Sequence, residues 1–257
     1  MTRKSTIRLI TIPMSHYCEK ARWGLERQGI DYYEERHLQV FHYPRTYRVS
    51  GGPNVPVLID KRTVVHDSTA ILKYLDGYAI NGRHLYPQDS EHRAQVETLE
   101  DLFDDVLGVE SRRWVYYHFR RRLIQAIRTA GQGVPWSEKL LMPVLYPVFA
   151  LLINKLLEPT SNNVEDGLNK VRDIVKTTDA LLAKDNTYLL DNSFSAADLS
   201  LACMLAPLVL PRNYGIRLPE PDELPEAAKP IVDEFRNTAT GEYVLKLYAT
   251  ERLLSGA

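Results

Sequence analysis

The sequence predicts a small α/β domain followed by an all-helical domain, on three observations. Residues 1–78 alternate short β-branched runs with helical runs, which is typical of a mixed sheet covered by helices. Residues 91–257 carry apolar residues at helical spacing. Residues 79–90 contain Gly82 and Pro87 and have the composition of a linker. We therefore expect domains at 1–78 and 91–257, joined by the linker 79–90.

The composition is that of an ordinary soluble protein, with 44% hydrophobic and 25% charged residues in a chain of 257. Lys and Arg together number 32 and Asp and Glu 33, which leaves a formal net charge of -1. Such a balanced charge gives no reason to expect nucleic acid or an anionic membrane as a partner.

The two cysteines, Cys18 and Cys203, lie far apart and do not show the pattern of a disulfide scaffold. Their number favours a reducing compartment, so we expect a cytoplasmic protein. Cys203 lies in the apolar run Leu201–Leu210, where a cysteine packs as a small buried hydrophobe.

One stretch, Leu140–Leu157, is apolar enough to be considered as a membrane span. It is shorter than the roughly 20 residues that a span needs. It is also interrupted by Pro143, Pro147 and Lys155. We therefore expect neither a membrane span nor contact with a membrane.

The first domain opens with a strand–helix–strand unit. Ile7–Ile12 is β-branched and ends before Pro13, which cannot continue a ladder of hydrogen bonds. Tyr17–Gln28 has helical spacing and is followed by Gly29, a common helix stop. Tyr32–Leu38 is the second predicted strand.

The rest of this domain predicts a hairpin and a closing helix. Val40–Arg48 shows no clear period. Val55–Ile59 and Thr63–His66 are predicted strands joined by a short turn. Asp67 and Ser68 then open a helix. The resulting order, β-α-β-(α)-β-β-α, is that of a small mixed sheet with helices on its faces.

Five helical segments are predicted in the second domain. They are Glu91–Ile127, Leu140–Leu157, Val164–Ala183, Ala196–Leu210 and Ala227–Leu254, the last broken at Gly241. Stretches that contain Pro and Asn separate them as loops.

The first candidate site is Ser15, at the junction of the first strand and the first helix. A serine there is an ordinary N-cap. The same place also stabilises an anion, because a helix start offers free N–H groups and a positive dipole end. The dipole contributes roughly 0.3–1 kcal/mol for a bound thiolate, and a hydroxyl that donates to the sulfur about 1.5–3 kcal/mol. Together they would lower a thiol pKa by roughly two units, since one unit is about 1.36 kcal/mol.

Two further segments each allow a structural and a functional interpretation. Pro56 follows Asn54-Val55 and is either a plain strand-entry residue or a cis proline that presents the backbone of Val55 to a ligand. Asp67 and Ser68 are either a helix-capping pair or ligands. As ligands they would offer a carboxylate for an ammonium group, and a hydroxyl with backbone N–H groups for a carboxylate.

In this order and spacing, the three segments resemble the glutathione site of the glutathione transferase superfamily. The resemblance covers residues 1–78 and continues at Asn192–Leu199, which is similar to the family's helix-capping motif. There Ser195 would be the N-cap and Asp198 the acid of a capping box. The resemblance implies a thioredoxin-like first domain, an all-helical second domain, glutathione as co-substrate and a homodimer.

The resemblance also implies a role for each matching residue. Ser15 corresponds to the residue that activates the thiol, Val55 to the residue whose backbone pairs with the cysteinyl part, and Pro56 to a cis proline. Asp67 and Ser68 correspond to the pair that holds the γ-glutamyl end. The family has Glu or Gln more often than Asp at the first position of this pair.

Cysteine chemistry is an alternative to serine chemistry at the same place. The segment from Ser15 to Cys18 also resembles the C-x-x-C motif of thioredoxin-like proteins, with Ser in place of the attacking cysteine. Packing is the ordinary role of a cysteine at the second, more buried position. A low thiol pKa remains open, because Cys18 lies in a first helical turn near Lys20 and Arg22. Tyr17 is a third candidate activator, because some family members use a tyrosine.

In the family, the acceptor substrate lies between the domains, beside a helix such as the aromatic segment Trp114–Phe119. Trp114, Tyr117 and His118 are candidates for the pocket wall, and His16 is a candidate for the wall or for a solvent-facing position. Core packing is the competing interpretation for the aromatic residues. The acceptor itself is expected to be a hydrophobic small molecule.

Other motifs carry less information. The Arg112-Arg113 and Arg120-Arg121-Arg122 runs are typical of a solvated helix face. We find no His, Cys and Asp cluster with metal-ligand spacing, so no metal is expected.

The sequence thus predicts a glutathione transferase-like enzyme whose bound thiolate attacks an electrophile or a peroxide. One alternative is a glutathione-dependent thiol-disulfide oxidoreductase that uses Cys18, and another is a non-catalytic binding protein with the same fold. The segment Gly131–Ser161 makes the second domain larger than is usual in the family. It can enlarge the acceptor pocket, bury a dimer face or touch a membrane, and the sequence does not choose among these.

Overall fold

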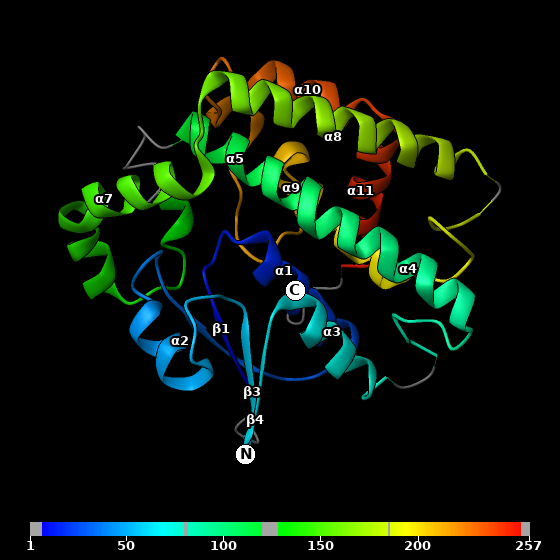
Figure 1. Ribbon diagram of the computed structural model, residues 1–257, viewed down its shortest axis with the longest axis horizontal. Coiled ribbons are helices and arrows are strands. Elements are labelled where there is room, and N and C mark those ends of the chain that lie inside the picture. Colours follow the sequence, from blue (N-terminus) through cyan, green and yellow to red (C-terminus); the bar gives the residue numbers. More distant parts are fainter. Residues whose placement is uncertain (1–6, 80–81, 120–127, 185, 253–257) are drawn as a thin grey trace.

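The computed structural model describes residues 7–79, 82–119, 128–184 and 186–252 (Figure 1). Its sheet has four strands: β1 (Ile7–Thr11), β2 (Tyr33–Arg36), β3 (Val57–Asp60) and β4 (Thr63–His66). Their spatial order is β2-β1-β3-β4. β1 is parallel to β2 and antiparallel to β3, and β3 is antiparallel to β4. This is the mixed sheet that the sequence predicts.

Three helices accompany the sheet: α1 (His16–Arg27), α2 (Tyr43–Ser50) and α3 (Ser68–Asp76). α1 and α3 pack together and share an apolar core with the central strands. Its buried members are Ile7, Leu9, Ala21, Leu25, Leu58, Ile71 and Leu75. α2 forms where the sequence shows no period, because Pro44 opens it and Gly51, at a φ of 74°, ends it in the left-handed region.

The described residues of the second domain contain helices and no strand. Its elements are α4 (Ser90–Leu102), the π-helical turn η1 (Phe103–Leu107), α5 (Gly108–Phe119), α7 (Trp136–Leu157), α8 (Ser161–Leu182), α9 (Ala196–Val209), the 3-10 turn η2 (Pro221–Glu223), α10 (Lys229–Arg236) and α11 (Ala239–Thr250). α9 is the central helix and packs against α1, α4, α5, α10 and α11. The fold is therefore a thioredoxin-like domain joined to a helical domain, as predicted.

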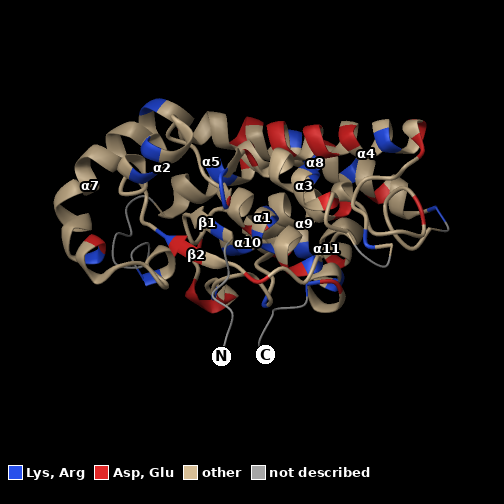
Figure 2. Cartoon of the chain, turned by 90° about the horizontal axis from the view of Figure 1, so that it is seen from below, with Lys and Arg blue, Asp and Glu red and all other residues tan. Residues whose placement is uncertain are grey.

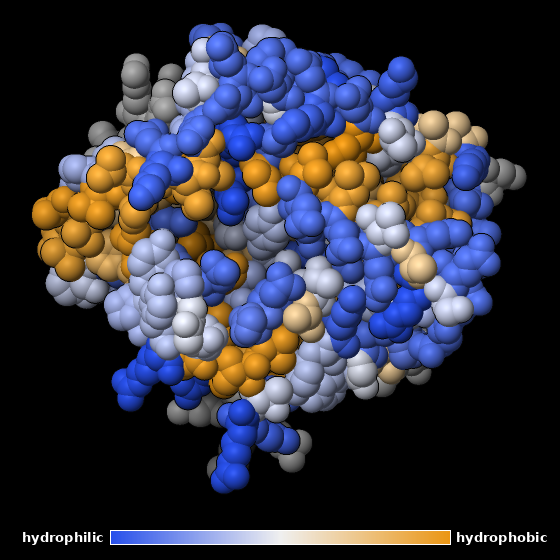
Figure 3. All heavy atoms as spheres, in the orientation of Figure 1, coloured by the Kyte–Doolittle hydropathy of each residue, from blue (hydrophilic) through white to orange (hydrophobic). Residues whose placement is uncertain are grey.

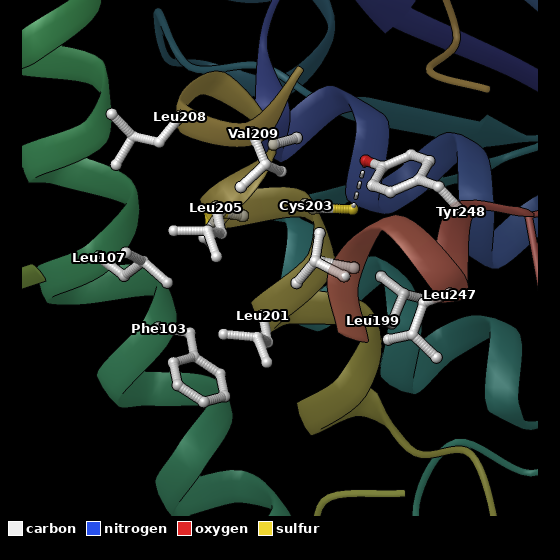
Figure 4. Close-up of a cluster of buried hydrophobic side chains, with 14 of the residues drawn as sticks. Phe103, Leu107, Leu199, Leu201, Cys203, Leu205, Leu208, Val209, Leu247 and Tyr248 are labelled. Atoms are coloured by element: carbon white, nitrogen blue, oxygen red, sulfur yellow. Dashed lines mark hydrogen bonds between the residues drawn. The ribbon is translucent and has the colours of Figure 1, made fainter. Parts of the chain in front are cut away.

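The capping motif before α9 has the predicted geometry. Asp198 accepts hydrogen bonds from the backbone N–H and the hydroxyl of Ser195, at 2.8 and 2.7 Å. Its other oxygen accepts from Tyr243 at 2.6 Å and from the N–H of Leu189. Further along α9, Cys203 is buried among apolar side chains, with the Tyr248 hydroxyl directed at its sulfur (Figure 4). The packing role predicted for Cys203 is confirmed.

Two predicted helix details are wrong. The segment Glu91–Ile127 is not one regular helix, because the π-helical turn separates α4 from α5, and residues 120–127 lie outside the described residues. The break in the last segment falls at Asn237-Thr238 and not at Gly241, since Thr238 caps α11 through the N–H of Gly241. Gly241 is needed for a close approach, because a Cβ there would lie 1.9 Å from the carbonyl oxygen of Phe235.

α7 begins four residues earlier than predicted and has an unusual environment. It is the one helix among the described residues that is long and apolar enough to cross a membrane. One of its faces packs on the loop after β2 through a small apolar cluster. The buried members of that cluster are Leu38, Val134, Met142, Phe149, Ile153 and Leu157. Its other face is exposed along most of the helix.

Candidate functional site

The sheet topology brings the three predicted site segments to one end of the sheet. In the antiparallel pair of β1 and β3, Ile10 lies opposite Val57, and in the pair of β3 and β4, Val57 lies opposite His66. The chain after β1, the chain before β3 and the chain after β4 therefore meet at the same end. These three segments contain Ser15, Val55-Pro56 and Asp67-Ser68.

Ser15 is the N-cap of α1 and is partly exposed. Its Oγ accepts a hydrogen bond from the N–H of Cys18 at 3.3 Å, and its own N–H donates to the carbonyl of Ile12. The capping interaction uses a lone pair of the hydroxyl oxygen, so the hydroxyl proton can still be donated, either to the neighbouring Cys18 sulfur or to a ligand. Ser15 can therefore cap the helix and donate to a ligand at the same time.

The Val55–Pro56 peptide bond is cis, as the resemblance implies. Pro56 is buried and Val55 is half-buried, directly before β3. Whether the Val55 backbone pairs with a ligand stays a prediction.

Asp67 is the N-cap of α3 and lies at a φ of 76°, where non-glycine residues are rare. Its side chain is exposed and accepts from the N–H of Ala70 at 3.0 Å. Since a carboxylate has four lone-pair sites, Asp67 keeps capacity for a ligand ammonium group. Ser68 is only 2% exposed, so its hydroxyl is covered and its predicted contact with a ligand carboxylate stays a prediction.

Cys18 faces the interior with none of its surface exposed. Burial raises the pKa of its thiol, and this outweighs the opposite effects of Arg22 and Ser15. A neutral, inaccessible thiol does not attack a disulfide, because the thiolate is the nucleophile. The geometry favours packing over redox chemistry for Cys18. Tyr17 is also engaged, since its hydroxyl donates to the carbonyl of Asp104 and burial raises its pKa to about 12.

His16 is not the solvent-facing residue that the sequence allows, because it is only 4% exposed. Burial and the nearby charge of Arg112 lower the pKa of His16 to about 3. Its Nε2 is buried without a hydrogen-bond partner. His16 is therefore neutral near pH 7 and too weak a base to deprotonate a thiol there.

The aromatic segment of α5 divides between core and rim. Trp114 is 1% exposed and belongs to the main core cluster, which favours core packing over a position in a pocket wall. Tyr117 and His118 are half-buried, with their rings in a T-shaped contact at 5.1 Å between centroids. Figure 3 shows this face of the molecule hollowed between α5 and the first domain.

Arg112 is the residue that the sequence interpretation missed. The Arg112-Arg113 run was expected on a solvated helix face, yet the Arg112 guanidinium lies 5.7 Å from the centroid of the Tyr17 ring. It is half-buried, and its Nε has no hydrogen-bond partner. Gly108, one turn earlier, permits this approach, because a Cβ there would lie 2.7 Å from the Tyr17 hydroxyl. Only the tertiary contact between α1 and α5 reveals a cation beside the first turn of α1.

One turn further along α1, a buried ionic network joins the two domains. The Lys20 Nζ lies 2.7 Å from the Glu100 carboxylate and 2.5 Å from the Asp104 carboxylate, and it donates to the Thr69 hydroxyl. Burial alone would lower the pKa of Lys20, but the two carboxylates raise it. Lys20 is therefore a structural cation that fixes α1 against α4 and η1.

The comparisons with known proteins agree with this arrangement. Residues 9–79 match the family model of the glutathione S-transferase N-terminal domain, and this range contains all three site segments. Over nearly the whole chain, the fold matches solved structures of glutathione transferases. The first domain thus matches the glutathione S-transferase N-terminal domain, and the chain as a whole has the glutathione transferase fold.

Three of these structures show the extent of the match. A glutathione S-transferase from Rhodospirillum rubrum F11 is 18% identical, with a TM-score of 0.59 over 96% of this chain and 100% of that chain. A glutathione S-transferase from Methylobacillus flagellatus KT with glutathione bound is 23% identical, with a TM-score of 0.53 over 93% and 98%. The beta-etherase LigF from Sphingobium sp. strain SYK-6 is 19% identical, with a TM-score of 0.59 over 94% and 99%.

Identities this low establish the fold of the chain and leave its chemistry to its own residues. No curated protein matches the sequence significantly. Among the described residues, we find no group of three or more His, Cys, Asp or Glu placed to hold a metal ion.

Proposed function

We propose that this protein is a glutathione transferase that activates the thiol of glutathione with Ser15 and the start of α1. The observation that carries the proposal is the partly exposed Ser15 hydroxyl, which caps α1 and keeps its proton for a ligand. The sheet places it at the same end as the cis Val55–Pro56 bond and Asp67.

Glutathione would lie across this end of the sheet. The backbone of Val55 would pair with its cysteinyl part, and the Asp67 carboxylate would accept from its ammonium group. The N–H groups at the start of α3, with Ser68, would receive its γ-glutamyl carboxylate. The sulfur would then lie against the first turn of α1.

Ionisation of the thiol needs no general base in this arrangement. The proton leaves to solvent, and the thiolate is stabilised by the Ser15 hydroxyl and by the free N–H groups of α1. Neutral His16 cannot serve as the base near pH 7, because its pKa is lowered to about 3. The positive charge of Arg112 adds to the potential that favours the thiolate.

In the reaction, the sulfur lone pair forms a new bond to an electrophilic atom of the acceptor. For a substitution, the leaving group departs with the electron pair of the broken bond. The acceptor would occupy the hollow between the first domain and α5, where Tyr117 and His118 offer aromatic surface. We therefore propose a hydrophobic electrophile as the acceptor, and we expect a cytoplasmic homodimer on the family resemblance.

The experiment compares Ser15→Ala and Ser15→Thr with the wild type in a conjugation assay with a chloronitrobenzene. Loss of a hydrogen bond to a charged sulfur costs about 1.5–3 kcal/mol, so kcat/KM should fall about 10- to 150-fold in Ser15→Ala. The pKa of the bound thiol, followed by the ultraviolet absorbance of the thiolate, should rise in step. Ser15→Thr keeps the hydroxyl and should retain most activity.

A matched control separates catalysis from helix capping. Thr238 caps α11 through the N–H of Gly241 at 2.9 Å, and it lies in a different part of the chain. Thr238→Ala should lose a similar stability, about 1 kcal/mol, with unchanged conjugation. Full activity of Ser15→Ala would refute the mechanism, and glutathione binding without turnover in the wild type would leave only a binding protein.

A further inference from the structure

α7 presents an uncovered apolar surface, here called the α7 face. The described residues include twelve large apolar side chains that are exposed, and eight of the twelve belong to this helix. They are Trp136, Leu140, Leu141, Val144, Val148, Leu151, Leu152 and Leu156, with exposed fractions from 41% to 76%. Figure 3 shows this hydrophobic surface at the left edge of the molecule. A single protein rarely leaves so large an apolar surface in contact with water.

The helix is anchored on its opposite side, so it lies along the protein. Met142, Phe149 and Ile153 are buried in the cluster formed with the loop after β2. In the first turn, Glu138 accepts from the N–H of Leu38 at 2.7 Å and contacts the ring of His37 at 2.7 Å. A helix that is apolar on both faces is ordinarily covered on both, and here the protein covers only one.

The charges around the α7 face indicate what covers the other side. Residues 140–154 contain no charged side chain, and the exposed Lys139 and Lys155 flank this stretch. Glu138 is buried and paired, and the next carboxylate along the chain is the exposed Glu158, at the cap of the helix. Figure 2 shows α7 nearly free of charge along its length, whereas α4 and α8 carry many charged turns.

We infer that the α7 face docks on the surface of a lipid bilayer that contains anionic lipids. Apolar side chains would enter the boundary between headgroups and acyl chains, and the two lysines would contact anionic headgroups. Trp136, 76% exposed at the end of the stripe, has the amphipathic ring that is enriched at membrane interfaces. The inference does not depend on the proposed function, and it reverses the expectation from sequence that the chain makes no membrane contact.

A second copy of the chain fits the charges less well. In a two-fold symmetric dimer, the α7 faces of the two copies would contact each other. Each lysine would then approach a lysine of the other copy or an uncharged stretch. Like charges opposed in this way weaken an interface. Anionic headgroups are complementary to both lysines.

The test is sedimentation of the full chain with vesicles of phosphatidylcholine, with and without phosphatidylglycerol. We expect binding to the anionic vesicles that weakens as salt is raised, and weaker binding to the neutral ones. Val144→Glu places a charge at a position that is 74% exposed, so the fold should persist while binding falls at least about tenfold. The matched control Tyr33→Glu, at an exposed position on β2, should bind like the wild type.

The charge contribution is tested separately. Lys139→Glu with Lys155→Glu should reduce binding to anionic vesicles about 20-fold or more, since each lysine near such a surface contributes about fivefold. The control Lys176→Glu with Lys246→Glu makes the same change of net charge at exposed positions on α8 and α11 and should bind normally. Equal binding of both double variants would overturn the electrostatic part of the inference.

Trp136 provides a direct reporter of contact. Trp23 and Trp114 are each 1% exposed, so a vesicle-induced blue shift of tryptophan emission should come from Trp136 and disappear in Trp136→Phe. Absence of wild-type binding to anionic vesicles would overturn the inference. So would a dimer, formed without lipid, that Val144→Glu dissociates.

Discussion

The first two turns of α1 use polar groups in opposite ways. In the first turn, the Ser15 hydroxyl keeps its proton, and the His16 Nε2 is buried without a partner. In the next turn, Lys20 contacts two carboxylates, and Glu19 pairs with Arg22 and Arg252. Both turns lie at the boundary of the two domains. Only in the second turn do the polar and charged side chains named here find all their partners within the protein.

This difference suggests separate roles for the two turns: the first is suited to bind a ligand, and the second supports the position of the helix. Buried polar groups are normally satisfied, so unused capacity in the first turn indicates a place for a ligand. Paired charges in the second turn fix the position of the helix. Glu19 reaches Arg252 near the end of the described chain, and Lys20 reaches α4. The network thereby holds in place the turn at which we propose that the chemistry occurs.

The largest expected effect comes from breaking the supporting turn. Lys20→Met keeps the length of the side chain but leaves Glu100 and Asp104 without their cation. Removal of one partner from a buried ion pair costs about 3–5 kcal/mol, so the free energy of unfolding should fall by that amount. Urea unfolding followed by circular dichroism measures it.

A triple variant tests the cause of that loss. Lys20→Met with Glu100→Gln and Asp104→Asn removes the whole set of charges and should recover much of the lost stability. If Lys20→Met is as stable as the wild type, the network does not hold the domains together and the comparison fails.

The second largest effect is expected for Arg112→Gln, which should change the pKa values of groups at the first turn of α1. Removal of the cation should raise the pKa of a bound glutathione thiol by up to about one unit. It should also raise the pKa of His16 from about 3, because the Arg112 charge is one of the two causes that lower it. Thiolate absorbance and NMR titration of the His16 ring report the two shifts.

The exposed Arg48 of α2 provides the control for charge. Arg48→Gln makes the same substitution away from α5 and should move neither pKa. If Arg112→Gln also leaves both unchanged, Arg112 is only a packing residue beside Tyr17.

The contrast between the turns also explains what the sequence revealed. The elements of the first domain and the capping motif at Ser195 and Asp198 were predictable, because periodicity and caps are local signals. The capping position of Ser15 was predictable for the same reason. Arg112 and the Lys20 network were missed because their partners lie far away in the sequence, so only the packed structure shows them. Residue type alone does not distinguish a core position from a pocket wall, so the sequence left two interpretations for Trp114 and for His16. Burial favours the core for Trp114 and rules out a solvent-facing position for His16.

A smaller effect is expected where α7 is tied to the first domain. The hydrogen bond that the His37 ring donates to Glu138 raises the pKa of His37 in the folded state, and the contact with Glu35 adds to this effect. A raised pKa means that its stabilisation is complete below the unfolded value of about 6.5 and is lost as pH rises through the folded value. His37→Gln should therefore lower the free energy of unfolding by about 1 kcal/mol at acidic pH and much less at alkaline pH.

Urea unfolding of His37→Gln and the wild type across this pH range provides the measurement. His92→Gln is a suitable control, since that ring is largely exposed and lies on α4. A difference that grows toward alkaline pH would contradict the assigned direction.

The smallest effect is expected at Cys18. It tests whether a buried group in the first turn of α1 can be removed without loss of activity. Cys18 lies in the same turn as the unused groups, but its thiol is fully buried and burial raises its pKa. If chemistry at this site follows access and unused hydrogen-bonding capacity, Cys18→Ala should leave conjugation within about twofold of the wild type. The lost sulfur should cost only the modest stability of a small core truncation. Iodoacetamide should modify the native wild type slowly, and unfolding should expose the thiol. Loss of glutathione-dependent disulfide reduction in Cys18→Ala, with conjugation intact, would instead show that this turn supports two chemistries and that burial in the resting structure does not decide between them.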